Sequence, residues 1–345
     1  MKRTISLICV IILILLICTL PSCGAQDTLR IYNWGLYMDE DILKEFTKET
    51  GIKIKYSTYA SNEEMYAKLS SGGSKYDLII PTDYMIERMI RDDMLEKIDY
   101  SNIPNFTYID ERFRNLAYDP ANEYSVPYMW GTNGIIYNTE MVDGEVDSWD
   151  VLWDERYADQ IIMYDSMRDS FVPALIKLGY SINTRSVVEL EQARDLLIEQ
   201  KPLVHAYMGD IMRDSMISGE AALGLMFSGD AIYCIEENPS LAYVVPREGS
   251  NIWFDSLVIP KGAKNKDKAE AFIDFLCRPG ISLRNTEYIG YSTVNTETLN
   301  MLPPELLDDP AYWPTDDIIR RCEIFLDLGD FARDLDQAWT MVLAS

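Results

Sequence analysis

Residues 29–51 read LRIYNWGLYMDEDILKEFTKETG, and their pattern decides the class of the fold. Leu29 to Tyr32 alternates apolar and polar side chains, which is typical of a half-buried strand. From Asp39 to Thr50, apolar side chains recur on one helical face, and Gly51 follows where a helix would end. The stretch therefore predicts one strand followed directly by one helix.

The same alternation continues along the chain on both sides of an irregular, aromatic and proline-rich stretch at Tyr118–Trp130. Strands separated by helices of about 10 to 12 residues predict parallel sheets with right-handed crossovers. We therefore expect an α/β protein with two compact lobes linked by short extended crossings. The expected strands cover residues 29–32, 52–58, 77–81, 134–137, 160–163, 223–226, 241–245 and 253–259. The expected helices cover residues 39–50, 62–71, 171–178, 187–199, 210–218, 267–277 and 279–288.

Aromatic and acidic side chains recur where the predicted strands end. In open parallel sheets the ligand site lies outside the carboxyl ends of the strands, so these segments are candidate binding loops. Each residue alone is more often a core aromatic or a helix N-cap than a ligand-binding residue, and the repetition is what points to a site. The segments are Asn33–Tyr37, Pro81–Tyr84, Asp165–Asp169, Phe227–Asp230 and Trp253–Asp255.

This combination suits a linear polyamine. An organic ammonium group is attracted to aromatic faces, but it leaves water only where carboxylates and hydrogen-bond acceptors replace its hydration. The methylene spacers prefer the ring faces. Aromatic walls with acidic ends therefore predict a site for a small cationic ligand.

At these segments the chain resembles the spermidine/putrescine-binding proteins of bacterial ABC transporters, a branch of the periplasmic solute-binding superfamily. The resemblance spans nearly all of the chain that follows the N-terminal apolar segment. The matching motifs are Tyr32–Trp34 with Tyr37, Phe46–Lys53, Tyr56–Tyr59 with Met65–Leu69, Tyr76–Leu78, Val126–Gly131, Asp255–Leu257 with Ile259–Pro260, Ala263–Lys266, and Ile289–Tyr291.

The resemblance implies a two-lobed periplasmic-binding-protein fold. Each lobe would be a mainly parallel sheet flanked by helices, and the two lobes would close on the ligand. The chain would cross between lobes near Trp130–Asn133, near Trp253 and around Thr296–Asn300. One lobe would comprise residues 29–130 and 254–299, and the other residues 131–253 and 300–345.

The resemblance also implies the role of particular residues. An aromatic box would comprise Trp34, Tyr37, Tyr84, Trp253 and Tyr291, with Phe227 where many members have tryptophan. Asp169 and Asp255 would bind amines, Asp83 would add an acid, and Asp230 resembles the carboxylate of putrescine-preferring members. The complete set of expected ligand-binding residues is Trp34, Tyr37, Thr82, Asp83, Tyr84, Asp169, Phe227, Asp230, Trp253, Asp255 and Tyr291.

Departures from the family pattern concern selectivity. Gly35–Leu36 lacks a polar residue often found there, Ser166 stands where spermidine-type members carry an aspartate, and Phe325 falls near a usual glutamine. The choice between putrescine and spermidine therefore stays open.

The N-terminus carries a targeting signal. Lys2 and Arg3 precede an apolar run that is shorter than the ~20 residues of a membrane span. Ser22–Cys23 then resembles a lipobox, despite the unusual Pro21. We expect residues 1–22 to be a lipoprotein signal peptide and 23–28 a tether lipidated at Cys23, with an ordinary signal peptide or an uncleaved anchor as alternatives. The protein would then be extracytoplasmic and anchored to a bacterial membrane.

Composition excludes several functions. The 345 residues include 56 acidic and 31 basic side chains, so nucleic-acid binding through a basic patch is excluded. The single histidine, His205, cannot build a multi-histidine metal site. Cys234, Cys277 and Cys322 would remain after processing, so at most one disulfide forms. We expect no cofactor, no resident metal and a monomer.

Rival functions remain at this stage. Related receptors bind sugars, ferric iron or other small cations, and several aspartates argue against a neutral sugar. An enzyme is disfavoured because the sequence carries no nucleophile elbow, phosphate loop or zinc spacing. A polyamine sensor or an adhesin with the same fold would look identical. We expect a receptor that delivers putrescine or spermidine to the permease subunits of an ABC importer.

Overall fold

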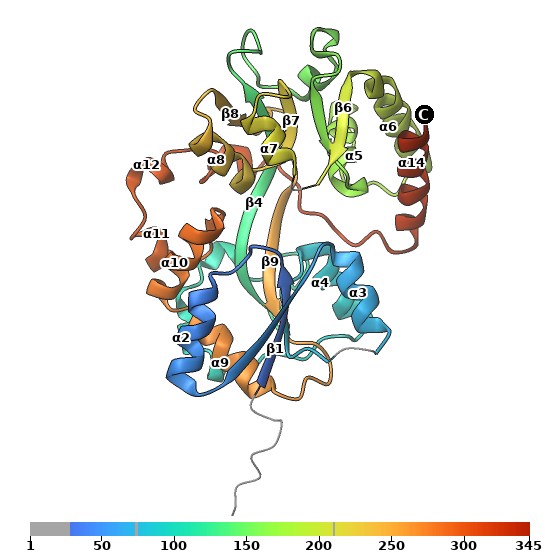
Figure 1. Cartoon of the computed structure of the whole chain (residues 1–345). Helices are drawn as coiled ribbons and strands as arrows, with labels where there is room; N and C mark the ends of the chain where they lie inside the picture. Colours follow the sequence, from blue (N-terminus) through green and yellow to red (C-terminus); the bar gives the residue numbers. More distant parts are fainter. Residues whose placement is uncertain (1–27, 73–74, 210) are drawn as a thin grey trace, which may run out of the picture.

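The computed structural model describes residues 28–72, 75–209 and 211–345. The expected signal peptide and Cys23 lie outside these residues. Figure 1 shows two α/β lobes, one above the other, with the long strands β4 (Ser125–Asn138) and β9 (Ile252–Val258) running between them. The expected two-lobed α/β fold is confirmed. None of the described helices is both long enough and apolar enough to span a membrane.

The strands form one continuous path in the order β2-β1-β3-β9-β4-β7-β5-β6, with β10 and β8 also paired to β4. Pairs β1–β2, β1–β3, β5–β6 and β5–β7 are parallel, whereas β4 and β9 run antiparallel to their neighbours. The remaining strands are β1 (Thr28–Trp34), β2 (Lys53–Tyr59), β3 (Leu78–Ile79), β5 (Ile161–Tyr164), β6 (Val204–Met208), β7 (Leu223–Phe227), β8 (Leu241–Val244) and β10 (Ser292–Thr293).

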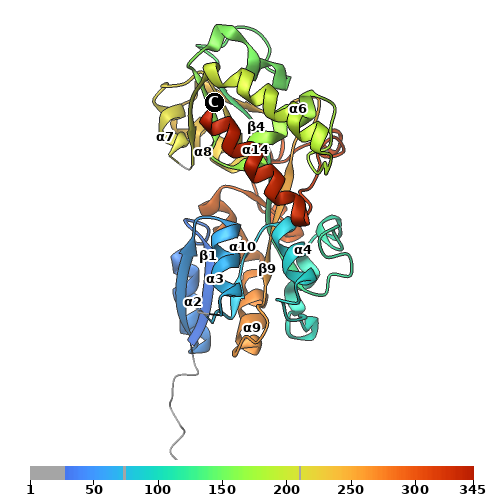
Figure 2. The same ribbon diagram turned by 90° about the vertical axis from the view of Figure 1, so that its right-hand side faces the viewer.

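The α-helices cover the faces of the two sheets (Figure 1). In Figure 2, α14 lies along α6 on the outside of the upper lobe. The α-helices are α2 (Glu40–Thr50), α3 (Asn62–Ser70), α4 (Asp83–Arg91), α5 (Met167–Lys177), α6 (Val187–Gln200), α7 (Met212–Ile217), α8 (Ser228–Glu237), α9 (Lys266–Leu276), α10 (Pro279–Ile289), α11 (Thr296–Leu299), α12 (Pro304–Leu307), α13 (Asp316–Ile319) and α14 (Ala332–Ala344). Short 3-10 helices cover Tyr100–Asn102, Pro104–Tyr108, Glu111–Phe113, Trp149–Trp153, Glu155–Tyr157, Lys201–Leu203 and Gly329–Phe331.

The first strand and helix form as their sequence predicts. The side chain of Asp39 caps α2 by accepting a hydrogen bond from the backbone N–H of Asp41. Gly51 ends the helix in the left-handed region, at φ 75°, where a residue without Cβ is favoured. Of the expected apolar face of Ile42, Leu43 and Phe46, Ile42 and Phe46 are buried and Leu43 is partly buried against the same core.

The expectation of irregular structure over Tyr118–Trp130 is wrong from Ser125 onward, because β4 begins there. Pro127 explains the error, since a proline inside a run of residues argues against a central strand. The structure accommodates it with a shift in the register of β4 against β9 between Pro127 and Met129. The expected helices also omitted α4 and α14.

Strand β4 belongs to both sheets. Its first half, from Ser125 to Thr132, pairs with β9, and its second half, from Asn133 to Asn138, pairs with β7 and β8. Thirteen of its 14 residues are buried. Strand β4, which is buried along nearly its whole length, therefore links the two lobes as a strand rather than as a flexible linker.

Each lobe has its own hydrophobic core. The first contains Phe46 and Trp130, and the second contains Trp149 and Phe325. The residues that pack against the first core include Trp313, Ile319, Cys322 and Ile324, whereas Phe325 belongs to the second core. This change of core favours a third crossing of the chain between the lobes at Ile324–Phe325 rather than at Thr296–Asn300. The lobe boundaries stay a prediction. Cys234, Cys277 and Cys322 carry free thiols.

Candidate functional site

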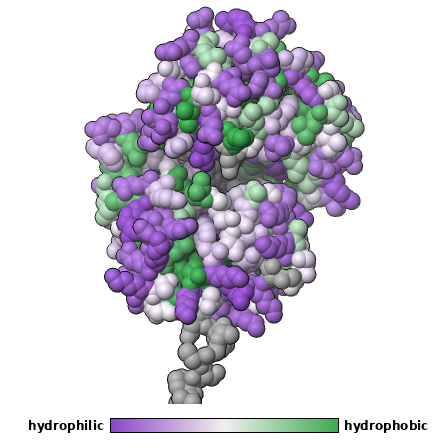
Figure 3. Space-filling view, in the orientation of Figure 1, coloured by the Kyte–Doolittle hydropathy of each residue, from purple (hydrophilic) through white to green (hydrophobic). Residues whose placement is uncertain are grey.

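Figure 3 shows a hollow between the two lobes. Strands β1, β5 and β7 end at Trp34, Tyr164 and Phe227. The long strand β9 carries Trp253 and Asp255.

Five aromatic side chains form a continuous row that joins the lobes. The ring of Tyr291 lies 6.0 Å from that of Tyr37 and 4.9 Å from that of Trp253. Phe227 continues the row, at 6.0 Å from Trp253 and 4.7 Å from Tyr164. Tyr37 and Tyr291 pack with the first core, whereas Phe227 and Tyr164 pack with the second. The structure therefore brings together four predicted residues and adds Tyr164.

Two glycines let the row pack closely against the backbone. A side chain at Gly229, the second residue of α8, would collide with the ring of Tyr291. A Cβ atom at Gly131 in β4 would lie 2.6 Å from the Trp253 ring. Because real Cβ atoms do not approach so closely, the arrangement requires glycine at both positions.

Asp255 lies at the Tyr37 end of the row. The Tyr37 hydroxyl donates a 2.7 Å hydrogen bond to Asp255 Oδ2. Asp255 Oδ1 is buried and accepts no hydrogen bond from the described residues. Burial raises the pKa of Asp255 to about 6, against the lowering effect of the Tyr37 and Thr82 hydroxyls. A buried acceptor without a donor suits an incoming cation.

Asp169, in the first turn of α5, is a second acid beside the crossing strand. Its carboxylate accepts hydrogen bonds from Asn133 Nδ2 at 2.7 Å and from the Ser166 hydroxyl at 2.6 Å. Burial raises the pKa of Asp169, although both hydrogen bonds lower it. Among the described residues, no lysine, arginine or histidine forms an ion pair with Asp169 or Asp255.

Asp230 differs from Asp169 and Asp255 because it forms an ion pair with an arginine of the protein. Arg213 Nη2 lies 2.7 Å from Asp230 Oδ1, and the Tyr164 hydroxyl donates to Oδ2 at 3.1 Å. The sequence did not predict a role for Arg213, because no local pattern indicates an ion pair with Asp230, 17 positions later.

Asp83 is fully buried and holds two elements together. Its Oδ1 accepts a hydrogen bond from the backbone N–H of Tyr84, and its Oδ2 accepts one from the backbone N–H of Phe254. The carboxylate thus links the start of α4 to β9. Thr82 forms an isolated β-bridge with Asp255. The structure therefore places Thr82 beside the site, but it does not bring the Asp83 carboxylate to the aromatic row.

Trp34 and Tyr84 lie outside the row. The Trp34 indole donates to the carbonyl of Ile80 at 2.8 Å, and its ring packs on Tyr59 at 4.7 Å. Tyr84 packs against both cores. Its ring lies 6.3 Å from the Phe325 ring, and the Arg168 guanidinium lies 4.1 Å from that same Phe325 ring. Tyr84 and Phe325 thus form a second aromatic contact between the lobes.

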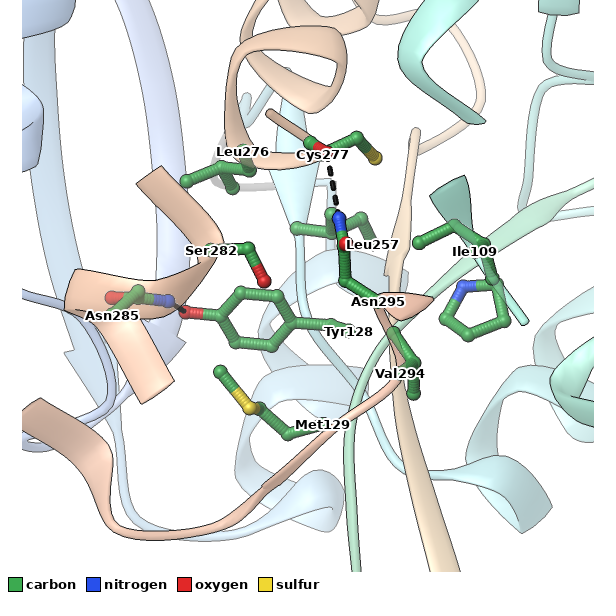
Figure 4. A pocket seen from close by; sticks show the side chains of 11 residues that line it. Ile109, Tyr128, Met129, Leu257, Leu276, Cys277, Ser282, Asn285, Val294 and Asn295 are labelled. Carbon is green, nitrogen blue, oxygen red and sulfur yellow. Dashed lines mark hydrogen bonds between the residues drawn. The ribbon is translucent and has the colours of Figure 1, made fainter. Parts of the chain in front are cut away.

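A separate small cavity lies within the first lobe (Figure 4). Its volume of about 20 Å³ is enough for one water molecule. Asn285 Nδ2 donates to the Tyr128 hydroxyl at 2.5 Å, and that hydroxyl donates to the Tyr37 carbonyl at 3.0 Å. The cavity is too small for a ligand, but its lining supports the loop that carries Tyr37.

A resident metal ion requires a cluster of ligand side chains. Within residues 28–72, 75–209 and 211–345, no group of three histidine, cysteine or acidic side chains is placed to hold a metal ion.

Comparison with known proteins shows the family. Residues 41–314 match the bacterial extracellular solute-binding protein family. The chain is 40% identical to the spermidine/putrescine-binding periplasmic protein of Salmonella typhimurium over 307 residues, which is 88% of each chain. A putative spermidine/putrescine ABC transporter structure from Listeria monocytogenes aligns with a TM-score of 0.88 at 40% identity, over 92% of this chain and 99% of that one. The Tp0655 lipoprotein of Treponema pallidum aligns with a TM-score of 0.84 at 32% identity, over 91% and 99%.

Proposed function

The chain belongs to the bacterial extracellular solute-binding protein family, and on that premise we propose that it captures putrescine or spermidine between its lobes and delivers it to an ABC importer. The family consists of binding proteins rather than enzymes. The Salmonella typhimurium relative is a spermidine/putrescine-binding protein. The Listeria monocytogenes relative is a putative spermidine/putrescine ABC transporter protein.

The observation that carries the proposal is the Asp255 carboxylate beside the aromatic row. One of its oxygens is buried without a donor in the part of the chain that the structure describes, so an ammonium group would supply hydrogen bonds and the balancing charge. The adjoining faces of Tyr37, Tyr291 and Trp253 would cover the methylene groups. Each cation–aromatic contact contributes about 0.5 to 2 kcal/mol, depending on burial.

Asp169 would bind the second ammonium group. Asn133 and Ser166 already orient its carboxylate, so little side-chain freedom remains to be lost on binding. Among the described residues neither Asp169 nor Asp255 forms an ion pair, and two such carboxylates argue against a neutral sugar, whose hydroxyls cannot balance their charge.

Calorimetric titration tests the proposal directly. Putrescine and spermidine should each bind the soluble chain that begins after Cys23, whereas glucose and ferric citrate should not. The ligand should be recovered unchanged, because a receptor returns what it binds. Failure of both amines to bind would overturn the proposal.

The same proposal includes the location and partners of the protein. The N-terminal pattern supports lipidation at Cys23 and an extracytoplasmic position on a bacterial membrane. One structural relative is itself a lipoprotein. We propose a monomer that docks on permease subunits. A sensor would bind the same amines but would not restore uptake in a strain that lacks its own receptor.

A further inference from the structure

Asp230 and Asp255 are both buried carboxylates hydrogen-bonded to a tyrosine, but only Asp230 forms an ion pair within the described residues. Both carboxylates accept a hydrogen bond from a tyrosine of the aromatic row, Asp255 from Tyr37 and Asp230 from Tyr164. Both are buried, at 5% and 4% exposure. Asp255 forms no ion pair with any described residue, whereas Asp230 is paired with the Arg213 guanidinium at 2.7 Å.

The Arg213 pair is part of the second lobe itself. Arg213 belongs to α7 and Asp230 to α8, two neighbouring helices that pack on each other. The thiol of Cys234 in α8 lies 3.8 Å from the Arg213 carbonyl and contacts the same turn. The guanidinium therefore does not depend on lobe closure to reach Asp230.

Asp230 is also connected with the opposite lobe. Burial and the nearby Asp230 carboxylate raise the pKa of Tyr291, while Arg213 lowers it. Gly229 lies directly under the Tyr291 ring. The Arg213–Asp230 pair thus lies at the edge of the row, where an additional ligand amine would otherwise find a carboxylate.

We propose that Arg213 is a specificity-determining residue, whose guanidinium occupies the cation position at Asp230 and leaves Asp255 and Asp169 for the ligand. The inference rests on the proposed function and narrows it to ligands with two ammonium groups. A third ammonium near Asp230 would meet a like charge instead of an open acid. The protein therefore prefers the diamine putrescine to the triamine spermidine.

The test compares wild type with Arg213→Gln by calorimetric titration of putrescine and spermidine. Wild type should bind putrescine more tightly. Arg213→Gln should raise the affinity for spermidine relative to putrescine by about tenfold or more, which corresponds to about 1.4 kcal/mol. The double variant Arg213→Gln with Asp230→Asn should return the ratio to the wild-type value, because the freed acid is gone.

Arg247→Gln is the matched control. Arg247 belongs to the same lobe and pairs with Asp147, but its side chain is 62% exposed, so the amine preference should not change. Arg213→Lys keeps a cation at Asp230 and should keep the preference for putrescine. Amine-induced shifts of the melting temperature give a second readout, since spermidine should stabilise Arg213→Gln more than it stabilises wild type.

The outcomes separate the inference from the proposed function. If wild type binds neither amine, the proposed function fails and the inference fails with it. If wild type binds amines but prefers spermidine, or if Arg213→Gln leaves the ratio unchanged, only the inference is overturned.

Discussion

The Tyr37 hydroxyl donates a 2.7 Å hydrogen bond to Asp255 Oδ2, across 218 positions of the sequence. This contact ties the loop after β1 to the crossing strand β9, and it fixes the carboxylate beside the aromatic row. The other oxygen of Asp255 is left buried without a donor among the described residues. The ionised carboxylate therefore carries an electrostatic cost that protonation or a bound cation would relieve.

Removing the charge of Asp255 should weaken binding but stabilise the empty protein. Asp255→Asn keeps the shape of the side chain, and loss of a buried charged partner typically costs about 2 to 5 kcal/mol of binding, or roughly 30-fold to several-thousand-fold in affinity. A pKa raised from 3.8 to about 6 means that the ionised group costs the fold up to about 3 kcal/mol at pH 7.

Calorimetry and urea denaturation measure the two effects of Asp255→Asn separately. Asp330→Asn is the control, because its side chain is 97% exposed, and it should change neither quantity. A variant that loses both affinity and stability would show that Asp255 acts mainly as a structural residue.

Amine affinity should fall as the pH drops through about 6. Below that pH the Asp255 carboxyl of the empty protein is protonated, so it cannot balance an ammonium group, and each further pH unit costs about tenfold in affinity. The stability contribution has the opposite sign, since this raised pKa makes the empty protein less stable as the pH rises from 3.8 to about 6. Titrations between pH 5 and 8 should show this slope in wild type and lose it in Asp255→Asn.

Gly229→Ala should weaken amine binding without unfolding the protein. The new methyl group would collide with the Tyr291 ring and displace it from Trp253. Overpacking of this kind costs about 1 to 3 kcal/mol, or roughly five- to 150-fold in affinity. Gly280→Ala is the control, because its Cβ would meet nothing within 4 Å. Equal affinities for the two variants would contradict a role for the Tyr291 contact.

Cys23→Ser should release the protein from the membrane. Lipid chains contribute about 0.8 kcal/mol per buried methylene group, so wild type should require detergent for extraction and the variant should not. Metabolic labelling with a palmitate analogue checks the modification. An unlipidated wild-type N-terminus would show that the lipobox assignment is wrong.

Sequence periodicity predicted the elements whose signals are local. Helix α2 carries its cap, its apolar face and its terminal glycine within 13 residues, from Asp39 to Gly51, so each signal supported the others. Only residues 134–137 of strand β4 were expected as a strand, because Pro127 opposes a central strand and the register shift that accommodates it depends on the partner strand.

The candidate site was predictable where residues lie at strand ends, as Tyr37 does after β1 and Phe227 does as the last residue of β7. The same rule cannot separate a ligand-binding acid from a structural one. The Asp83 carboxylate accepts a hydrogen bond from the backbone N–H of Phe254 in β9. This is a tertiary contact that the local sequence does not predict. Arg213 likewise reaches Asp230 only through the packing of α7 on α8.

Native mass spectrometry of the soluble protein tests the central claim most directly, because a captured polyamine identifies itself by its mass. Wild type equilibrated with equal amounts of putrescine, spermidine and glucose should carry one amine molecule per chain, and Asp255→Asn should carry none under the same conditions. A wild-type spectrum without an amine adduct, or equal amine occupancy in Asp255→Asn, would contradict the account.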